Sequence, residues 1–195
     1  MLNWFIPLFI FIIVAGFTPG PNNIIAMGIG FNFGFKKVIP HLLGVTIGFP
    51  VMLLLIGFAI VNLMQNYEYI FTILKYLSSI YLLYLAYKIA NSPLKIEDTT
   101  HKPITFTESL IFQWINPKAW AGAIATVTLY LPKDNYTFAL IVAAITSAIT
   151  IVFAIALWGY LGKKVKSILS NPKHIKIFNI TMATLLVISV VLILF

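Results

Sequence analysis

The chain has 195 residues, of which 61% are apolar and only 18 are charged, 13 of them basic and 5 acidic. A soluble domain of this length carries roughly 49 charged residues, since charged side chains make up about 25% of such proteins. The mean hydropathy is +0.99. These values exclude a soluble globule, a nucleic-acid-binding domain and a disordered chain. They indicate an all-α integral membrane protein, and the net charge of +8 is then expected to reflect membrane topology.

Apolar stretches long enough to cross a bilayer, about 20 residues each, follow one another along the whole chain. We expect six transmembrane helices, at about 4–31, 38–63, 69–90, 109–131, 136–160 and 175–195. They form one transporter domain, residues 1–195, with a first repeat at about 1–90 and a second at about 109–195. The polar connection between them, about 91–108, holds three of the five acids.

The lysines predict the orientation of these helices. Ten lysines fall in the connections after the first, third and fifth stretches, and two fall on the opposite side: Lys36, Lys37, Lys88, Lys95, Lys102, Lys163, Lys164, Lys166, Lys173 and Lys176 against Lys75 and Lys133. Cytoplasmic loops carry the excess of basic residues, so both termini are expected outside. The basic run at 163–166 is also typical of a lipid contact, but topology alone accounts for it.

Two of the apolar stretches are interrupted, half a chain apart. The first contains Thr-Pro-Gly-Pro-Asn-Asn at 18–23, and the fourth contains Asn-Pro-Lys at 116–118. Pro19 and Pro117 are 98 residues apart, about half the chain. Three spans in each half is an odd number, so the second half must enter the membrane from the other side. This is a 3+3 inverted repeat with broken helices 1 and 4, the arrangement in which paired breaks mark a transport site.

The breaks are expected to expose backbone groups that cannot face lipid. Proline lacks an N–H and clashes with the preceding turn, which makes Pro19 and Pro117 the helix-breaking residues. Pro21 suits the first turn of a restarted helix, whose N-terminal end attracts a carboxylate. The predicted substrate-binding residues are Thr18, Gly20, Pro21, Asn22, Asn23, Gln113, Asn116 and Lys118. The alternative is that each proline only kinks its helix.

Two ionisable side chains are candidates for function. Lys118 is the one ionisable residue well inside a predicted span, where charge is costly and its default interpretation is functional. A substrate carboxylate would supply its partner; alternatively, the side chain snorkels to the interface. His41, at the inner end of the second span, titrates in the range that suits a proton carrier. It is alternatively an ordinary helix-end residue.

Glycines recur at the four-residue spacing that brings membrane helices into close contact. The pairs are Gly16/Gly20, Gly30/Gly34 and Gly44/Gly48. Packing inside the chain is the simpler interpretation, and a homodimer face is the other.

Enzymatic motifs are missing from the sequence. The chain has no cysteine, no His-Glu-x-x-His zinc motif and no phosphate-binding Gly-Lys-Ser/Thr loop. We therefore expect no catalytic residue, no metal and no cofactor, and a transporter that is driven by an ion gradient or by the gradient of its own substrate.

The interrupted segments resemble those of the LysE/RhtB family of amino-acid exporters. The resemblance rests on Thr-Pro-Gly-Pro-Asn at 18–22, Gly-Phe-Lys-Lys at 34–37, Pro-His-Leu-Leu-Gly at 40–44 and Gln-Trp-Ile-Asn-Pro-Lys-Ala-Trp at 113–120. It implies export of amino acids or related metabolites from the cytoplasm across the plasma membrane of a prokaryote, with coupling to protons.

The residues favour a neutral, zwitterionic cargo, such as homoserine, threonine or a branched-chain amino acid. A basic amino acid or another cation is the alternative, which the lack of a deep carboxylate disfavours. A membrane-embedded enzyme and a non-transporting subunit are the remaining hypotheses.

Overall fold

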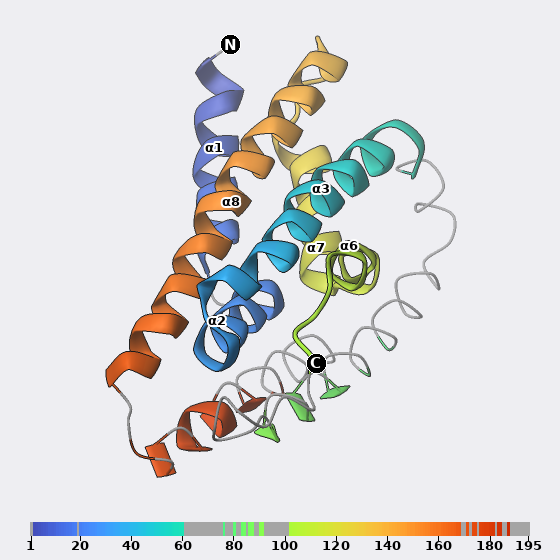
Figure 1. Ribbon diagram of the computed structural model, residues 1–195. Coiled ribbons are helices and arrows are strands. Elements are labelled where there is room, and N and C mark those ends of the chain that lie inside the picture. The colour runs from blue at the N-terminus through green and yellow to red at the C-terminus, as the bar shows by residue number, and fades with distance from the viewer. Residues whose placement is uncertain are drawn as a thin grey trace.

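The computed structural model describes residues 2–18, 20–60 and 102–168, together with scattered positions between 76 and 91 and between 171 and 187. Within these ranges every regular element is a helix (Figure 1). In chain order they are α1 (Leu2–Phe17), α2 (Pro21–Phe33), the 3₁₀ turn η1 (Phe35–Val38), α3 (Ile39–Leu55), the π-helical turn η2 (Ile56–Ile60), α6 (Phe106–Ile115), α7 (Pro117–Ala125), the π-helical turn η3 (Thr126–Tyr130) and α8 (Tyr136–Ile168).

Two of the described helical segments are long and apolar enough to cross a membrane, Phe35–Phe58 and Tyr136–Val165. The pair α1 and α2, bent by 44° at its break, makes a third if it is counted as one span. These three correspond to the first, second and fifth predicted stretches. The fourth is divided into α6 and α7 and begins at Phe106, slightly earlier than predicted. The third and sixth lie largely outside the described residues.

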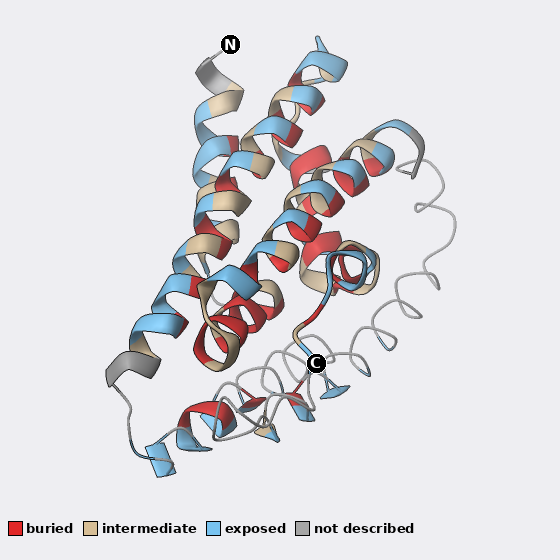
Figure 2. Ribbon diagram, in the orientation of Figure 1, coloured by how far each residue is buried: buried red, intermediate tan, exposed pale blue. Residues whose placement is uncertain are grey.

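The outer surface of the long helices is apolar, as a lipid-facing surface requires. On α3 the exposed residues recur every fourth position, and on α8 they follow a similar row (Figure 2). They are Ile39, Leu43, Ile47, Val51 and Leu55 on α3, and Ile141, Ile145, Ile149, Phe153 and Leu157 on α8. A soluble helix would place polar side chains on such a face, so the burial pattern agrees with the membrane class that composition predicts.

Helix α8 packs against α1, α2 and α3, and glycines allow its closest approach to α2. A Cβ at Gly30 would overlap the Gly159 carbonyl, and one at Gly162 would overlap the Met27 carbonyl. Gly16 similarly lies against Thr150 of α8. Backbone-to-backbone contact of this kind is what small residues provide in membrane helices.

The packing interpretation of the glycine pairs is therefore confirmed at most positions. Gly44 and Gly48 contact α6, and Gly20 lies against the Lys118 side chain. Because these glycines are covered within the chain, they do not themselves form a dimer face. Gly34 differs, because its φ of +82° ends α2 in a conformation that favours glycine.

We expect Gly30→Ala to lower the thermal stability of the protein in detergent. Overpacking a tight contact costs about 1–3 kcal/mol, and here the obstacle is the rigid backbone of Gly159. The matched control is Gly122→Ala on α7, where the nearest atom, Phe49 Cζ, is 4.0 Å from the added Cβ. Both changes gain the same helix propensity. Equal melting temperatures for the two variants would contradict the close α2–α8 contact.

Candidate functional site

The first break lies between α1 and α2. α1 ends at Phe17, and α2 restarts at Pro21 with Gly20 as its extended N-cap. Proline is tolerated at the first position of a helix because its missing N–H would have no partner there. Pro19 itself lies outside the described residues. The interruption falls where the sequence predicts it.

Polar side chains cover the carbonyls that this break frees. Asn23 Nδ2 donates to the Gly16 and Thr18 oxygens at 2.8 and 2.9 Å. The Thr18 hydroxyl donates back to the Val14 oxygen at 2.6 Å. Trp158 Nε1 donates to the Phe17 oxygen at 3.2 Å from α8. Thr18 and Asn23 are both among the residues selected from the sequence, whereas Trp158 is not; its only signal is that a buried indole N–H needs an acceptor.

The second break lies between α6 and α7, at Asn116. Asn116 is extended, with φ −82° and ψ 109°, because a residue that precedes proline is disfavoured in the helical region. Its side-chain oxygen caps α7 by accepting the Lys118 N–H at 3.1 Å. Thr105 and Glu108 form a capping box that starts α6. The local chemistry of Asn-Pro-Lys thus produces both the break and the restart.

The two breaks meet through Lys118. Its Nζ donates to the Thr18 carbonyl at 3.1 Å and lies 3.4 Å from the Thr18 hydroxyl. A Cβ at Gly20 would come within 2.7 Å of Nζ, so glycine there makes room for the lysine. The side chain therefore extends from the second break to the first.

A pair of amides also joins the two halves of the chain. Asn22 Nδ2 donates to Gln113 Oε1 at 2.8 Å, and Gln113 Nε2 donates back to Asn22 Oδ1 at 3.3 Å. Gln113 Nε2 also donates to the Ser109 oxygen at 2.8 Å, and the side chain is fully buried. This reciprocal pair fixes α2 against α6 beside the breaks.

His41 lies behind this pair and not at a solvated helix end. It is fully buried, with Nε2 3.0 Å from the Asn22 carbonyl oxygen and Nδ1 2.9 Å from Ser109 Oγ. The Ser109 hydroxyl is also 2.8 Å from the Thr105 oxygen. The ring thus contacts a predicted binding residue through its backbone without lining the cavity.

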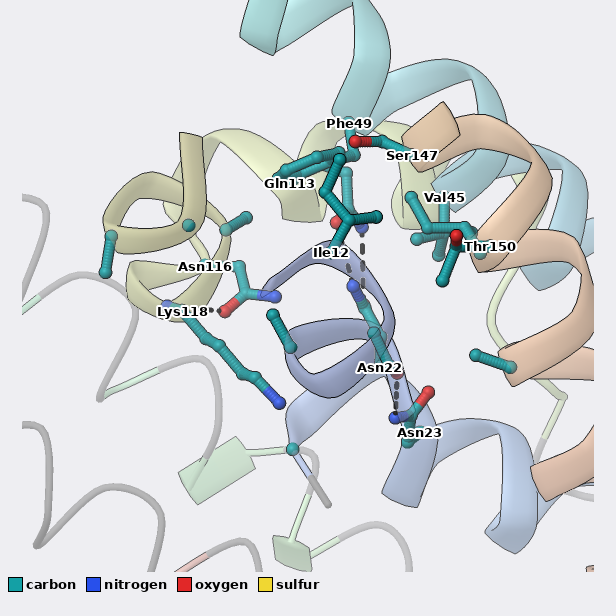
Figure 3. A pocket seen from close by; sticks show the side chains of 18 of the residues that line it. Ile12, Asn22, Asn23, Val45, Phe49, Gln113, Asn116, Lys118, Ser147 and Thr150 are labelled. Carbon is teal, nitrogen blue, oxygen red and sulfur yellow. Dashed lines mark hydrogen bonds between the residues drawn. The ribbon is translucent and has the colours of Figure 1, made fainter. Parts of the chain in front are cut away.

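A cavity of about 390 Å³ lies between the breaks and α8 (Figure 3). This is within the range of about 300–1,000 Å³ that small-molecule sites occupy. Seven of the eight predicted binding residues line it: Gly20, Pro21, Asn22, Asn23, Gln113, Asn116 and Lys118. The eighth, Thr18, contacts it through Lys118. None of the described residues that line it is acidic.

The cavity-lining residues that α1, α3 and α8 contribute are not predicted from the sequence. These are mostly apolar, with two hydroxyl side chains from α8, and they include Ile12, Val45, Phe49, Ser147, Thr150 and Ile155. No break or charge marks these positions in the sequence.

An apolar outer surface around a mostly apolar cavity, with polar side chains from the two helix breaks on its wall, defines a membrane protein with an internal solute site. The sequence model of the LysE type translocator family matches residues 13–194. The chain belongs to this family, and it is a transporter and not an enzyme, as the sequence predicts.

Curated relatives cover most of the chain. A cysteine/O-acetylserine efflux protein of Salmonella typhimurium (strain LT2) is 32% identical over 77% of each chain. A protein of the same description from Escherichia coli (strain K12) is 28% identical over 90% of this chain and 89% of its own. No solved structure matches the chain.

Proposed function

We propose that this protein exports small amino acids with uncharged side chains from the cytoplasm. The observation that carries the proposal is the Lys118 ammonium group, held at the α1–α2 break on the wall of a cavity whose described lining residues include no acid. Cysteine and O-acetylserine, which are named for the relatives, are both small zwitterions with uncharged side chains. A basic amino acid would bring a second cation into a cavity in which the described lining offers no carboxylate, which is unfavourable at low dielectric.

The substrate carboxylate binds between Lys118 and the N-terminus of α2 in this proposal. The first turn of a helix leaves its N–H groups without intrahelical partners, and here they belong to Asn22 and Asn23. Asn116 adds a donor: since its oxygen accepts the Lys118 N–H, its amide NH₂ faces away from that cap (Figure 3). Ammonium, amide and helix terminus together form an anion site.

The substrate ammonium group meets a poorer environment. The Gly16 and Phe17 carbonyls each already accept one bond, from Asn23 and Trp158, and the Thr18 carbonyl accepts two, from Asn23 and Lys118. Only the second lone pairs of the Gly16 and Phe17 carbonyls therefore remain for it. Binding is then weak, which suits an exporter that must release its cargo.

His41 is proposed as the proton carrier, because its partners satisfy both charge states. Nε2 faces a carbonyl oxygen and must carry a hydrogen. In the neutral ring, Nδ1 accepts from the Ser109 hydroxyl. In the charged ring, Nδ1–H donates to Ser109 Oγ, whose hydrogen turns to the Thr105 oxygen. One hydroxyl rotation therefore accommodates the proton, next to the backbone of Asn22.

We also propose the six-span 3+3 inverted repeat in a prokaryotic plasma membrane, with both termini outside. In support of this repeat, Pro21 and Pro117 each begin the second helix of a broken pair.

Because the chain has no native cysteine, single cysteines at Ser92 and Ser170, both outside the described residues, can report on which side of the membrane these positions lie. We expect both to resist an impermeant thiol reagent added outside intact cells. A cysteine at Lys133, in the opposite connection, is the accessible control, and labelling at all three positions would contradict the topology.

Counterflow in proteoliposomes tests the exporter proposal. Vesicles loaded with an unlabelled amino acid should take up the same labelled compound when it is small and uncharged in its side chain. Lysine, arginine and divalent metal ions should not exchange. Exchange of these cations in preference to neutral amino acids, or no exchange of any amino acid, would refute the proposal.

A further inference from the structure

Ser147 of α8 is a buried polar residue that no step of the proposed transport mechanism uses. It lines the cavity and is 2% exposed, yet its hydroxyl has no hydrogen-bond partner among the described residues. A buried polar group without a partner costs free energy, and native structures contain few of them.

Several hydroxyls in the described helices avoid this cost by bonding to their own backbone. Ser109, Thr126 and Thr181 each donate to the carbonyl four residues earlier, at 2.8, 2.8 and 2.9 Å. This is the usual arrangement for serine or threonine inside a helix. Ser147 does not adopt it, so its hydroxyl remains available to a ligand in the cavity.

The place of Ser147 in the cavity indicates the chemistry of that partner. Figure 3 shows its side chain at the end of the cavity where Phe49 is drawn, well separated from Lys118. Phe49, Val45 and the methyl-bearing Thr150 also line this cavity. Gln113 is occupied by Asn22 and the Ser109 carbonyl. A ligand anchored by its carboxylate at Lys118 would extend its other end toward Ser147.

We infer that Ser147 recognises the side chain of the substrate, by a hydrogen bond to a short side chain that bears a hydroxyl, thiol or ester group. This inference rests on the proposed export of amino acids and adds the side-chain class. The surrounding wall is apolar enough to accept a methyl group in the same position. Ser147 therefore sets the preference for a polar over an apolar side chain of equal size.

The test compares L-serine with L-2-aminobutyrate, in which a methyl group replaces the hydroxyl. Initial counterflow rates of both are measured in proteoliposomes, and their ratio does not depend on the amount of inserted protein. We expect the wild-type protein to favour serine. Ser147→Ala should lower the serine preference about 3- to 10-fold, the value of one neutral hydrogen bond, while transport of 2-aminobutyrate continues. Ser147→Thr keeps a hydroxyl and should retain a serine preference.

Thr46→Val on α3 is the matched control. The Thr46 hydroxyl also lacks a partner among the described residues, but Thr46 does not line the cavity. Its loss should therefore leave the ratio unchanged.

If Ser147→Ala does not reach the membrane, Ser147→Cys is used instead. Its thiol forms only weak hydrogen bonds, so it should lower the ratio of serine to 2-aminobutyrate transport in the same direction. An unchanged ratio with both substrates still transported would overturn the role of Ser147 alone. Absence of amino-acid counterflow in the wild-type protein would overturn the proposed function instead.

Discussion

Lys118→Ala is expected to reduce transport of every amino-acid substrate by at least about 10-fold. All such substrates share the carboxylate, and a hydrogen bond to a charged group contributes about 1.5–3 kcal/mol. The lysine also donates to the Thr18 carbonyl, so its loss removes a contact between the two breaks. Initial rates normalised to inserted protein measure the effect.

Substitution by arginine should not restore transport. The guanidinium is larger and planar, and Gly20 leaves little room beside the Lys118 ammonium, since even a Cβ there would approach Nζ to 2.7 Å. Lys133→Ala removes an exposed lysine that does not line the cavity and should leave the rates unchanged. Wild-type rates in Lys118→Ala would exclude this residue from the binding site.

His41→Gln is expected to separate exchange from driven transport. The amide can still donate to the Asn22 carbonyl, which the imidazole Nε2 contacts at 3.0 Å, but it does not titrate. Counterflow should therefore persist, while efflux driven by an imposed pH gradient falls at least about 10-fold, because the carrier of the proton is missing.

The controls for His41 distinguish coupling from structure. His174→Gln changes an exposed histidine and should retain driven efflux. Ser109→Ala removes the hydroxyl that pairs with Nδ1 at 2.9 Å and should shift the pH dependence of driven efflux without abolishing counterflow. Full driven efflux in His41→Gln would contradict the proton role, and loss of counterflow together with driven efflux would indicate a purely structural one.

The breaks could be predicted from the sequence because their causes are local. The Pro-Gly-Pro run at 19–21 disfavours a continuous helix far more than the single prolines inside α1 and α3 do. At the second break, Asn116 both precedes a proline and caps the helix that begins there. Lys118 could be selected because a charge inside an apolar stretch has few structural explanations. These features need only neighbouring residues, and the structure has α2 and α7 restarting at Pro21 and Pro117.

The rest of the site depends on packing between distant segments. Ser147, Trp158 and Phe49 lie in continuous apolar stretches, where no local signal shows which face meets the cavity. The pairing of Asn22 with Gln113 spans 91 residues and depends on how α2 and α6 pack together. The carbonyls expected to hold the substrate ammonium group are also already bonded, in part to Trp158, which single motifs do not reveal.

The proposed site binds a free α-carboxylate at Lys118 and the α2 N-terminus. Competition in the counterflow assay tests it most directly, with labelled L-serine as reporter and unlabelled L-serine, L-serinamide and L-serine methyl ester as competitors. The two modified compounds retain the ammonium group and side chain but lack the carboxylate. We expect that, in the wild-type protein, only unlabelled L-serine reduces the counterflow of labelled L-serine. Equal competition by the amide and the ester would contradict it.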